Sequence, residues 1–186
     1  MVSSGTLHVV ATEMTVGSFA MAGTAFLLAG LASHGVTRLE AYLKHFDHIA
    51  HFALAFGLLA MPLAIFSGIQ SSPGDGIDHP LLINKLFLSS ASLGLALGVL
   101  LARRSRGVAI WEHTMSKRWQ MLGGMVASGL ILLTASIGGT FSRGESLLDF
   151  FHLPYDMVPL MPMWLSLLVI IGAVLNLVAV RRSSNA

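Results

Sequence analysis

Long apolar runs separated by short polar segments dominate the sequence. A helix needs roughly 20 apolar residues to cross a bilayer core about 30 Å thick. Five runs have that length: residues 9–31, 49–69, 81–102, 119–141 and 158–180. Because an apolar chain in lipid must satisfy its backbone internally, we expect each run to be a helix. The pattern predicts an all-α fold, a single membrane domain over residues 1–186 built as a bundle of five transmembrane helices.

Turn and cap residues mark several helix ends. Gly35 follows the first run and predicts that the first helix stops there. Thr37-Arg38-Leu39-Glu40 has the spacing of a capping box, so we expect the second helix to begin at Thr37. Asp78-His79-Pro80 is typical of the start of a helix, and we expect the third one to begin there.

The basic residues predict the orientation of the bundle. Nine of the eleven lysines and arginines fall on one side of five spans: Arg38, Lys44, Arg103, Arg104, Arg106, Lys117, Arg118, Arg181 and Arg182. The side richer in lysine and arginine is the cytoplasmic one. We therefore expect a multi-pass protein of the cell's inner (plasma) membrane, with its N-terminus outside and its C-terminus in the cytoplasm.

Composition narrows the function classes. Charged residues make up 11% of the chain, against about a quarter in a soluble domain, and the mean hydropathy is +0.75. These values exclude an ordinary soluble enzyme, and a formal charge of +2 gives no reason to expect nucleic acid as a partner. The absence of cysteine excludes disulfides and thiolate metal sites. No catalytic motif is present, so the sequence leaves open whether the protein is an enzyme.

Small residues recur at helical spacing in two of the predicted helices. Ser90, Gly94 and Gly98 follow each other at intervals of four, and so do Gly124 and Ser128. Such stripes let the backbones of membrane helices approach closely. We expect both stripes to lie at helix–helix contacts.

Two charged residues fall inside the predicted spans. Glu13 lies near the start of the first span and Lys85 near the start of the third. Charged groups in hydrocarbon are costly and mark either a pair or a functional site. We expect a Glu13–Lys85 ion pair, whose role is either structural or part of a ligand or proton pathway.

Histidines gather at both ends of the predicted helices. His51 is placed inside the cytoplasmic boundary, with His48 and His113 near it, whereas His8 and His79 begin the first and third helices on the outer side. Imidazoles from two membrane helices are the usual axial ligands of a b-type haem. The candidate cofactor is therefore haem b, with His8, His51 and His79 as metal ligands, or a haem together with a quinone pocket. The alternative is that these histidines only hydrogen-bond lipid headgroups or backbone carbonyls.

The order of these features resembles a family of small bacterial and archaeal membrane proteins catalogued as a domain of unknown function. The matching positions are His8, Ser67-Gly68, His79 and the stretch Thr134-Ala135-Ser136-Ile137-Gly138-Gly139. Members of that family typically have four helices, and some are fused to or encoded beside Rieske iron–sulfur or cytochrome proteins. The resemblance implies a redox-associated membrane module.

The resemblance covers roughly residues 7 to 142, and the chain departs from the family pattern in two places. The second histidine of the family's first helix is replaced by Glu13, and a fifth helix is added. The leading hypothesis is a cytochrome-b-like subunit of a respiratory or other electron-transfer complex, which passes electrons between a partner and the quinone pool. The alternative is a cofactor-free structural subunit that packs against the helices of a larger membrane complex.

Overall fold

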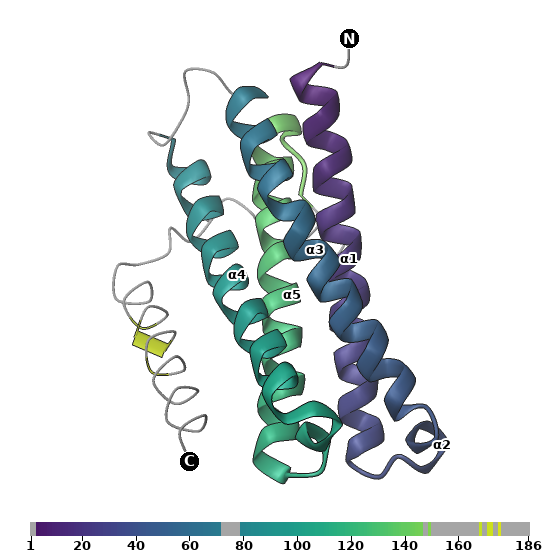
Figure 1. The fold of residues 1–186 in the computed structure, drawn as a ribbon. Helices are drawn as coiled ribbons and strands as arrows, with labels where there is room; N and C mark the ends of the chain where they lie inside the picture. Colours follow the sequence, from purple (N-terminus) through teal and green to yellow (C-terminus); the bar gives the residue numbers. More distant parts are fainter. Residues whose placement is uncertain are drawn as a thin grey trace.

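The computed structural model describes residues 3–71 and 79–146, together with positions 149, 168, 171, 172 and 175. This part of the chain is helical and contains no strand (Figure 1). Its elements are α1 (Ser4–Ser33), α2 (Thr37–Glu40), α3 (Leu43–Ser71), α4 (Pro80–Arg106), the 3₁₀ helix η1 (Gly107–Trp111) and α5 (Thr114–Arg143).

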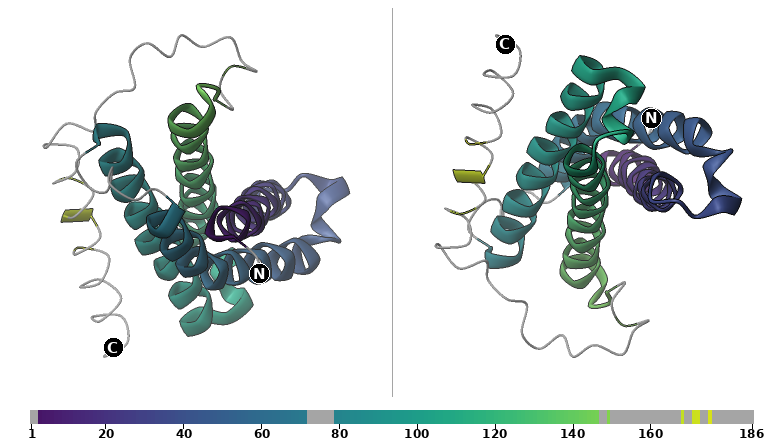
Figure 2. Two further views of the ribbon diagram at one scale, coloured as in Figure 1. Left: turned by 90° about the horizontal axis from the view of Figure 1, so that it is seen from above. Right: turned by 90° about the horizontal axis from the view of Figure 1, so that it is seen from below.

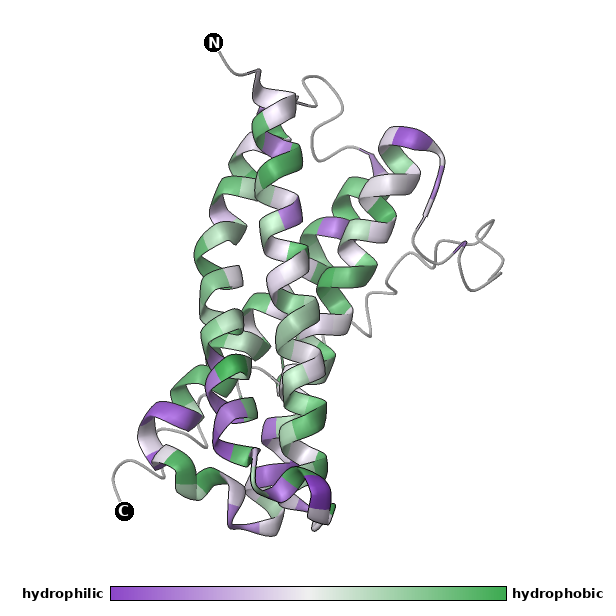
Figure 3. Ribbon diagram, turned by 90° about the vertical axis from the view of Figure 1, so that its right-hand side faces the viewer, coloured by the Kyte–Doolittle hydropathy of each residue, from purple (hydrophilic) through white to green (hydrophobic). Residues whose placement is uncertain are grey.

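Within the described residues, four helices are long and apolar enough to cross a membrane: α1, α3, α4 continued by η1, and α5. Helices of 27 to 30 residues are about 40–45 Å long, which exceeds the hydrocarbon thickness. Figure 3 shows hydrophobic residues along the middle of the bundle and hydrophilic residues gathered toward its ends. The predicted all-α membrane fold is confirmed for these four spans, whereas the predicted fifth span, residues 158–180, lies almost wholly outside the described residues.

The bundle is built around α1. This helix packs extensively against α3 and α5, α4 packs against α5, and α3 and α4 touch each other little (Figures 1 and 2). Phe19 and Phe26 of α1 and Leu54 of α3 are fully buried at the centre. Most other core residues of α1 are alanines, so the neighbouring backbones can approach closely.

Glycines make room for the large core side chains. A Cβ on Gly57 of α3 would lie 2.6 Å from the Phe19 ring, and one on Gly124 of α5 would lie 2.1 Å from the Phe26 ring. Ser128 lies four residues after Gly124 in α5, and a Cβ on Gly23 of α1 would lie 2.8 Å from its Cβ. The predicted contact through Gly124 and Ser128 is confirmed.

The predicted stripe on the third span has a different environment. Ser90 and Gly94 are exposed, and nothing lies within 4 Å of a Cβ placed on Gly94. The buried face of α4 is formed by Asn84, Ser89, Ser92, Ala96 and Val99. For the described part of the chain, the expected contact through Ser90 and Gly94 is therefore wrong, because the neighbouring polar and β-branched residues face α5 instead.

The helix ends agree with the sequence at two points and differ at one. Gly35 has φ +90°, a left-handed conformation that suits glycine, directly after α1 ends. His79 caps α4 and Pro80 occupies its first turn. Thr37, however, does not start the second long helix. The chain makes the single turn α2, which has no side-chain cap, and α3 begins at Leu43.

Candidate functional site

A buried carboxylate joins α3 to α4 at one end of the bundle. Asp47 of α3 is 1% exposed, and Arg103 of α4 donates to it in a fork. Nε lies 3.0 Å from both carboxylate oxygens, and Nη2 lies 2.6 Å from Oδ2. A planar guanidinium satisfies a carboxylate in this geometry better than a single cation does. The two helices are thus tied at this end, which we call the Asp47 end.

Trp111 completes the surroundings of the carboxylate. Its indole Nε1 donates to Asp47 Oδ1 over 2.7 Å, and its ring is 3% exposed. The 3₁₀ helix η1 places the indole there: Gly107, with φ +60°, ends α4 and lets the chain turn back under the bundle. Buried polar groups are stable when all of them are bonded, and both oxygens of Asp47 have donors.

His51 extends this network to α5. Its Nδ1 lies 2.6 Å from the carbonyl of Asp47, and its Nε2 lies 2.7 Å from Nε2 of Gln120. A carbonyl can only accept, so Nδ1 carries the proton and Nε2 accepts from the amide. The second amide hydrogen of Gln120 goes to the carbonyl of Val99. Asp47, His51, Arg103, Trp111 and Gln120 therefore form one continuous set of hydrogen bonds, the Asp47 network.

This geometry does not fit a haem at the Asp47 end. An axial ligand binds through a free imidazole nitrogen, and both nitrogens of His51 are already bonded to protein. The His51 ring also lies edge-to-face on Phe26, with centroids 5.0 Å apart. The other two candidates predicted near His51, His48 and His113, are exposed, and His113 is the N-cap of α5. The structure does not bring these two together with His51.

His8 is the candidate whose geometry suits a ligand. It lies at the opposite end of the bundle, which we call the His8 end, where Nδ1 is 3.0 Å from the carbonyl of Ala64 and 3.3 Å from Oγ of Ser67 on α3. Donation to a carbonyl fixes the proton on Nδ1 and leaves the lone pair of Nε2 available, an arrangement common in metal-ligating histidines. Gly68 gives the ring its space, because a Cβ there would lie 2.9 Å from Cε1.

His79 is held in the opposite tautomer. Its Nδ1 accepts from the backbone N–H of Leu81 over 3.2 Å, so the neutral ring carries its proton on Nε2. The ring also packs edge-to-face on Phe141 of α5. Binding iron through Nε2 would move the proton to Nδ1, where it would face the Leu81 N–H. His8 thus fits as one axial ligand, whereas His79 does not fit as its mate. Within the described residues, no three or more histidines and carboxylates form a metal cluster.

The predicted Glu13–Lys85 ion pair is not formed in the described part of the chain. Lys85 lies along α5, where a Cβ on Gly138 would be 3.0 Å from its Nζ. Glu13 is exposed on α1. The physical reason is the rotation of α1: Glu13 lies nine residues, or about two and a half turns, from the buried residue Ala22 and so points away from the bundle.

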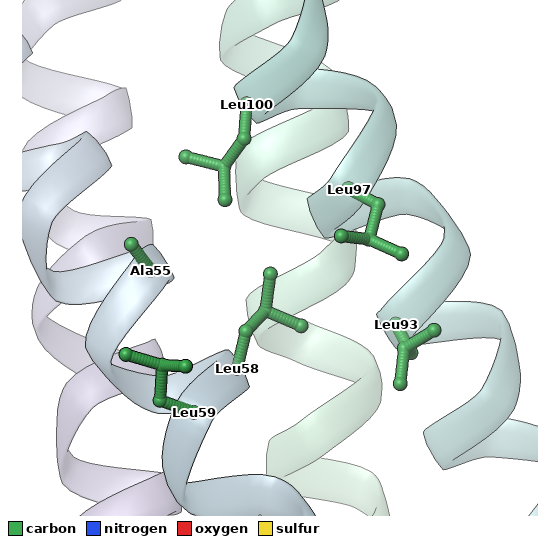
Figure 4. A pocket seen from close by; sticks show the side chains of 6 residues that line it. All are labelled: Ala55, Leu58, Leu59, Leu93, Leu97 and Leu100. Carbon is green, nitrogen blue, oxygen red and sulfur yellow. The ribbon is translucent and has the colours of Figure 1, made fainter.

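An apolar groove of about 380 Å³ follows the weak contact between α3 and α4 (Figure 4). Its lining is Ala55, Leu58, Leu59, Leu93, Leu97 and Leu100. These side chains offer no hydrogen-bond donor to a quinone carbonyl, although their shape admits a flexible apolar chain. The residues that line this groove therefore do not support the expected quinone pocket with a hydrogen-bond donor.

Sequence reasoning found His51 but missed four of the five members of the network. Asp47 falls between His45 and His48 in a polar stretch, where a carboxylate is normally solvated. The available signal was its spacing: Asp47 and His51 are four residues apart, on one face of a helix. No sequence signal pairs Asp47 with Arg103, which is 56 residues away.

Comparisons of the chain with protein families, with curated proteins and with solved structures find no match. The resemblance of His8, Ser67-Gly68, His79 and the Thr134–Gly139 stretch to the family of redox-associated membrane proteins therefore stays a prediction.

Proposed function

We propose that this protein is a cofactor-free structural subunit that packs against the helices of a larger membrane complex. The observation that carries the proposal is the Asp47 network. Both ring nitrogens of His51 form hydrogen bonds within the bundle. The ion pair between Asp47 and Arg103 joins α3 to α4. The side chains of the Asp47 network bond to one another and to the backbone, and so they hold α3, α4 and α5 together.

The short connections between the described helices support the idea that a partner is contacted within the membrane. Residues 34–42 join α1 to α3 and residues 107–113 join α4 to α5, so within the described residues little of the chain lies outside the four spans. A partner must then be recognised mainly by helix sides. We further propose the orientation that the basic residues favour, with the Asp47 end on the cytoplasmic side.

The experiment is purification from native membranes in a mild detergent, followed by native gel electrophoresis and an absorption spectrum. We expect the protein to migrate in an assembly larger than a single chain and to show no haem absorption of its own after separation from partners. Migration as a lone chain would contradict the structural role.

A second candidate function is the electron-transfer role, and His8 is the observation that favours it. Its Nδ1 is bonded to a carbonyl and its Nε2 is available, as a haem ligand requires. A Soret band in the purified chain that is lost in His8→Ala, and retained in the exposed control His48→Ala, would establish this function in place of the first.

A further inference from the structure

The outward face of α1 carries a carboxylate. Glu13 is the only aspartate, glutamate, lysine or arginine in α1, and it is exposed on the side of the helix opposite the buried stripe. Figure 2 shows α3 and α5 against α1, and apart from the turn of α2 near the Asp47 end no other described helix packs extensively on α1. The carboxylate therefore points to whatever surrounds the bundle.

The depth of Glu13 makes this exposure costly. It lies four residues inside the N-terminal end of the apolar stretch 9–31, which is about 6 Å along the helix axis. Charged side chains inside a span are rare and normally face a partner or water. Among the described residues, no lysine, arginine or histidine forms an ion pair with Glu13.

Small residues continue the same face toward the middle of the span. Gly17, Ala20 and Thr24 follow Glu13 at intervals of four, three and four, which keeps them on one side of a helix. No atom lies within 4 Å of a Cβ on Gly17, and the Thr24 hydroxyl donates to the carbonyl of Ala20. A second helix can approach such a strip closely.

We propose that the α1 back face, formed by Glu13, Gly17, Ala20 and Thr24, docks a spanning helix of another polypeptide that carries a lysine or arginine at the depth of Glu13. The proposal rests on the proposed structural role and names its contact surface. The charge selects the occupant: two copies of this chain related by a twofold axis through this face would bring two Glu13 carboxylates together, whereas a basic partner pairs with one.

The first test uses the full chain in phosphatidylcholine vesicles with labelled polyleucine helices as probes. One probe carries a single lysine at the matching depth, a second carries glutamate there, and a third carries only leucine. We expect energy transfer to report about fivefold tighter association of the lysine probe than of the leucine probe, since one interhelical polar contact is worth about 1 kcal/mol. Glu13→Leu should remove the difference, and Glu13→Lys should favour the glutamate probe.

Two further variants separate a docking face from simple charge attraction. Gly17→Leu keeps the carboxylate and fills the open space beside it. We expect this variant to weaken the association of the lysine probe about as much as Glu13→Leu does. Leu63 is 55% exposed on α3 and lies near the depth of Glu13, because His8 contacts Ala64 and Gly57 contacts Phe19. The double variant Glu13→Leu/Leu63→Glu moves the carboxylate to another helix and should not restore binding.

Equal association of the lysine and leucine probes with the wild type would overturn the proposal, and so would full recovery in the double variant. Native gels then distinguish this failure from failure of the structural role. An assembly that persists in Glu13→Leu and Gly17→Leu contradicts the α1 back face alone. A wild-type chain that migrates alone contradicts the structural role, while the vesicle experiment still decides whether the face binds a basic helix.

Discussion

Asp47 and Arg103 are 56 residues apart in the chain, yet the guanidinium contacts both oxygens of the carboxylate in a site that leaves Asp47 1% exposed. Removing one partner of such a pair leaves a buried charge without compensation. We expect Arg103→Ala to lower the free energy of unfolding in detergent by about 3 kcal/mol, measured by thermal or denaturant unfolding.

The matched control for that prediction is Arg104→Ala, which removes a neighbouring exposed arginine with no hydrogen bond in the described residues. Its stability should stay near that of the wild type. Equal losses in both variants would mean that total charge, and not the Asp47 contact, decides stability.

The His51–Gln120 contact predicts a tautomer. Nitrogen NMR of labelled histidine should find His51 protonated on Nδ1 and unprotonated on Nε2. Gln120→Leu removes the donor to Nε2 and to the Val99 carbonyl, and should cost about 1–3 kcal/mol of stability. Gln70→Leu, on the exposed side of α3, is the control. A His51 proton on Nε2 would contradict the assigned network.

The close approach of α5 to α1 depends on Gly124. A methyl group at this position would overlap the fully buried ring of Phe26, so Gly124→Ala should destabilise the bundle by about 1–3 kcal/mol in unfolding experiments. Gly129→Ala adds the same methyl group to the same helix in open space and should be neutral or slightly stabilising. A neutral Gly124→Ala would show that α5 can shift at no cost.

A substitution of Lys85 tests whether the ammonium group at the His8 end contributes to the stability of the bundle. Its Nζ has no hydrogen bond in the described residues, although it lies along α5 beside Gly138. An ammonium group inside a span is costly, so Lys85→Met should raise the melting temperature in detergent. Lys44→Met, at an exposed position at the start of α3, should leave it unchanged. A lower melting temperature for Lys85→Met would reveal a stabilising role for the amine.

The presence of the four described helices and some of their ends could be predicted from the sequence, because bilayer thickness and turn residues act locally. Gly35 and the His79-Pro80 cap are examples, since each needs only its immediate neighbours. The failed capping box at Thr37 is also local, but it depends on Val36 and on the turn that follows. Element type was therefore more predictable than the point at which α3 begins.

Which face of each helix is buried was less predictable. Gly94 and Gly124 occur in similar patterns of small residues, yet only Gly124 meets a large side chain, that of Phe26. The rotation of each helix about its axis is set by the helices that pack against it, and the spacing of residues within one helix does not determine that rotation. The same limit produced the expected Glu13–Lys85 pair, because their similar depth said nothing about the direction in which Glu13 points.

Because of the Asp47–Arg103 ion pair, α3 and α4 are held together more firmly at one end of the bundle than farther along. It joins α3 and α4 at one end, while an apolar groove separates the same two helices farther along. We therefore expect thermal bending to part α3 from α4 least at the Asp47 end and most toward the His8 end. Because the groove between α3 and α4 is lined by apolar side chains, we expect acyl chains of the surrounding lipid to enter it from the side.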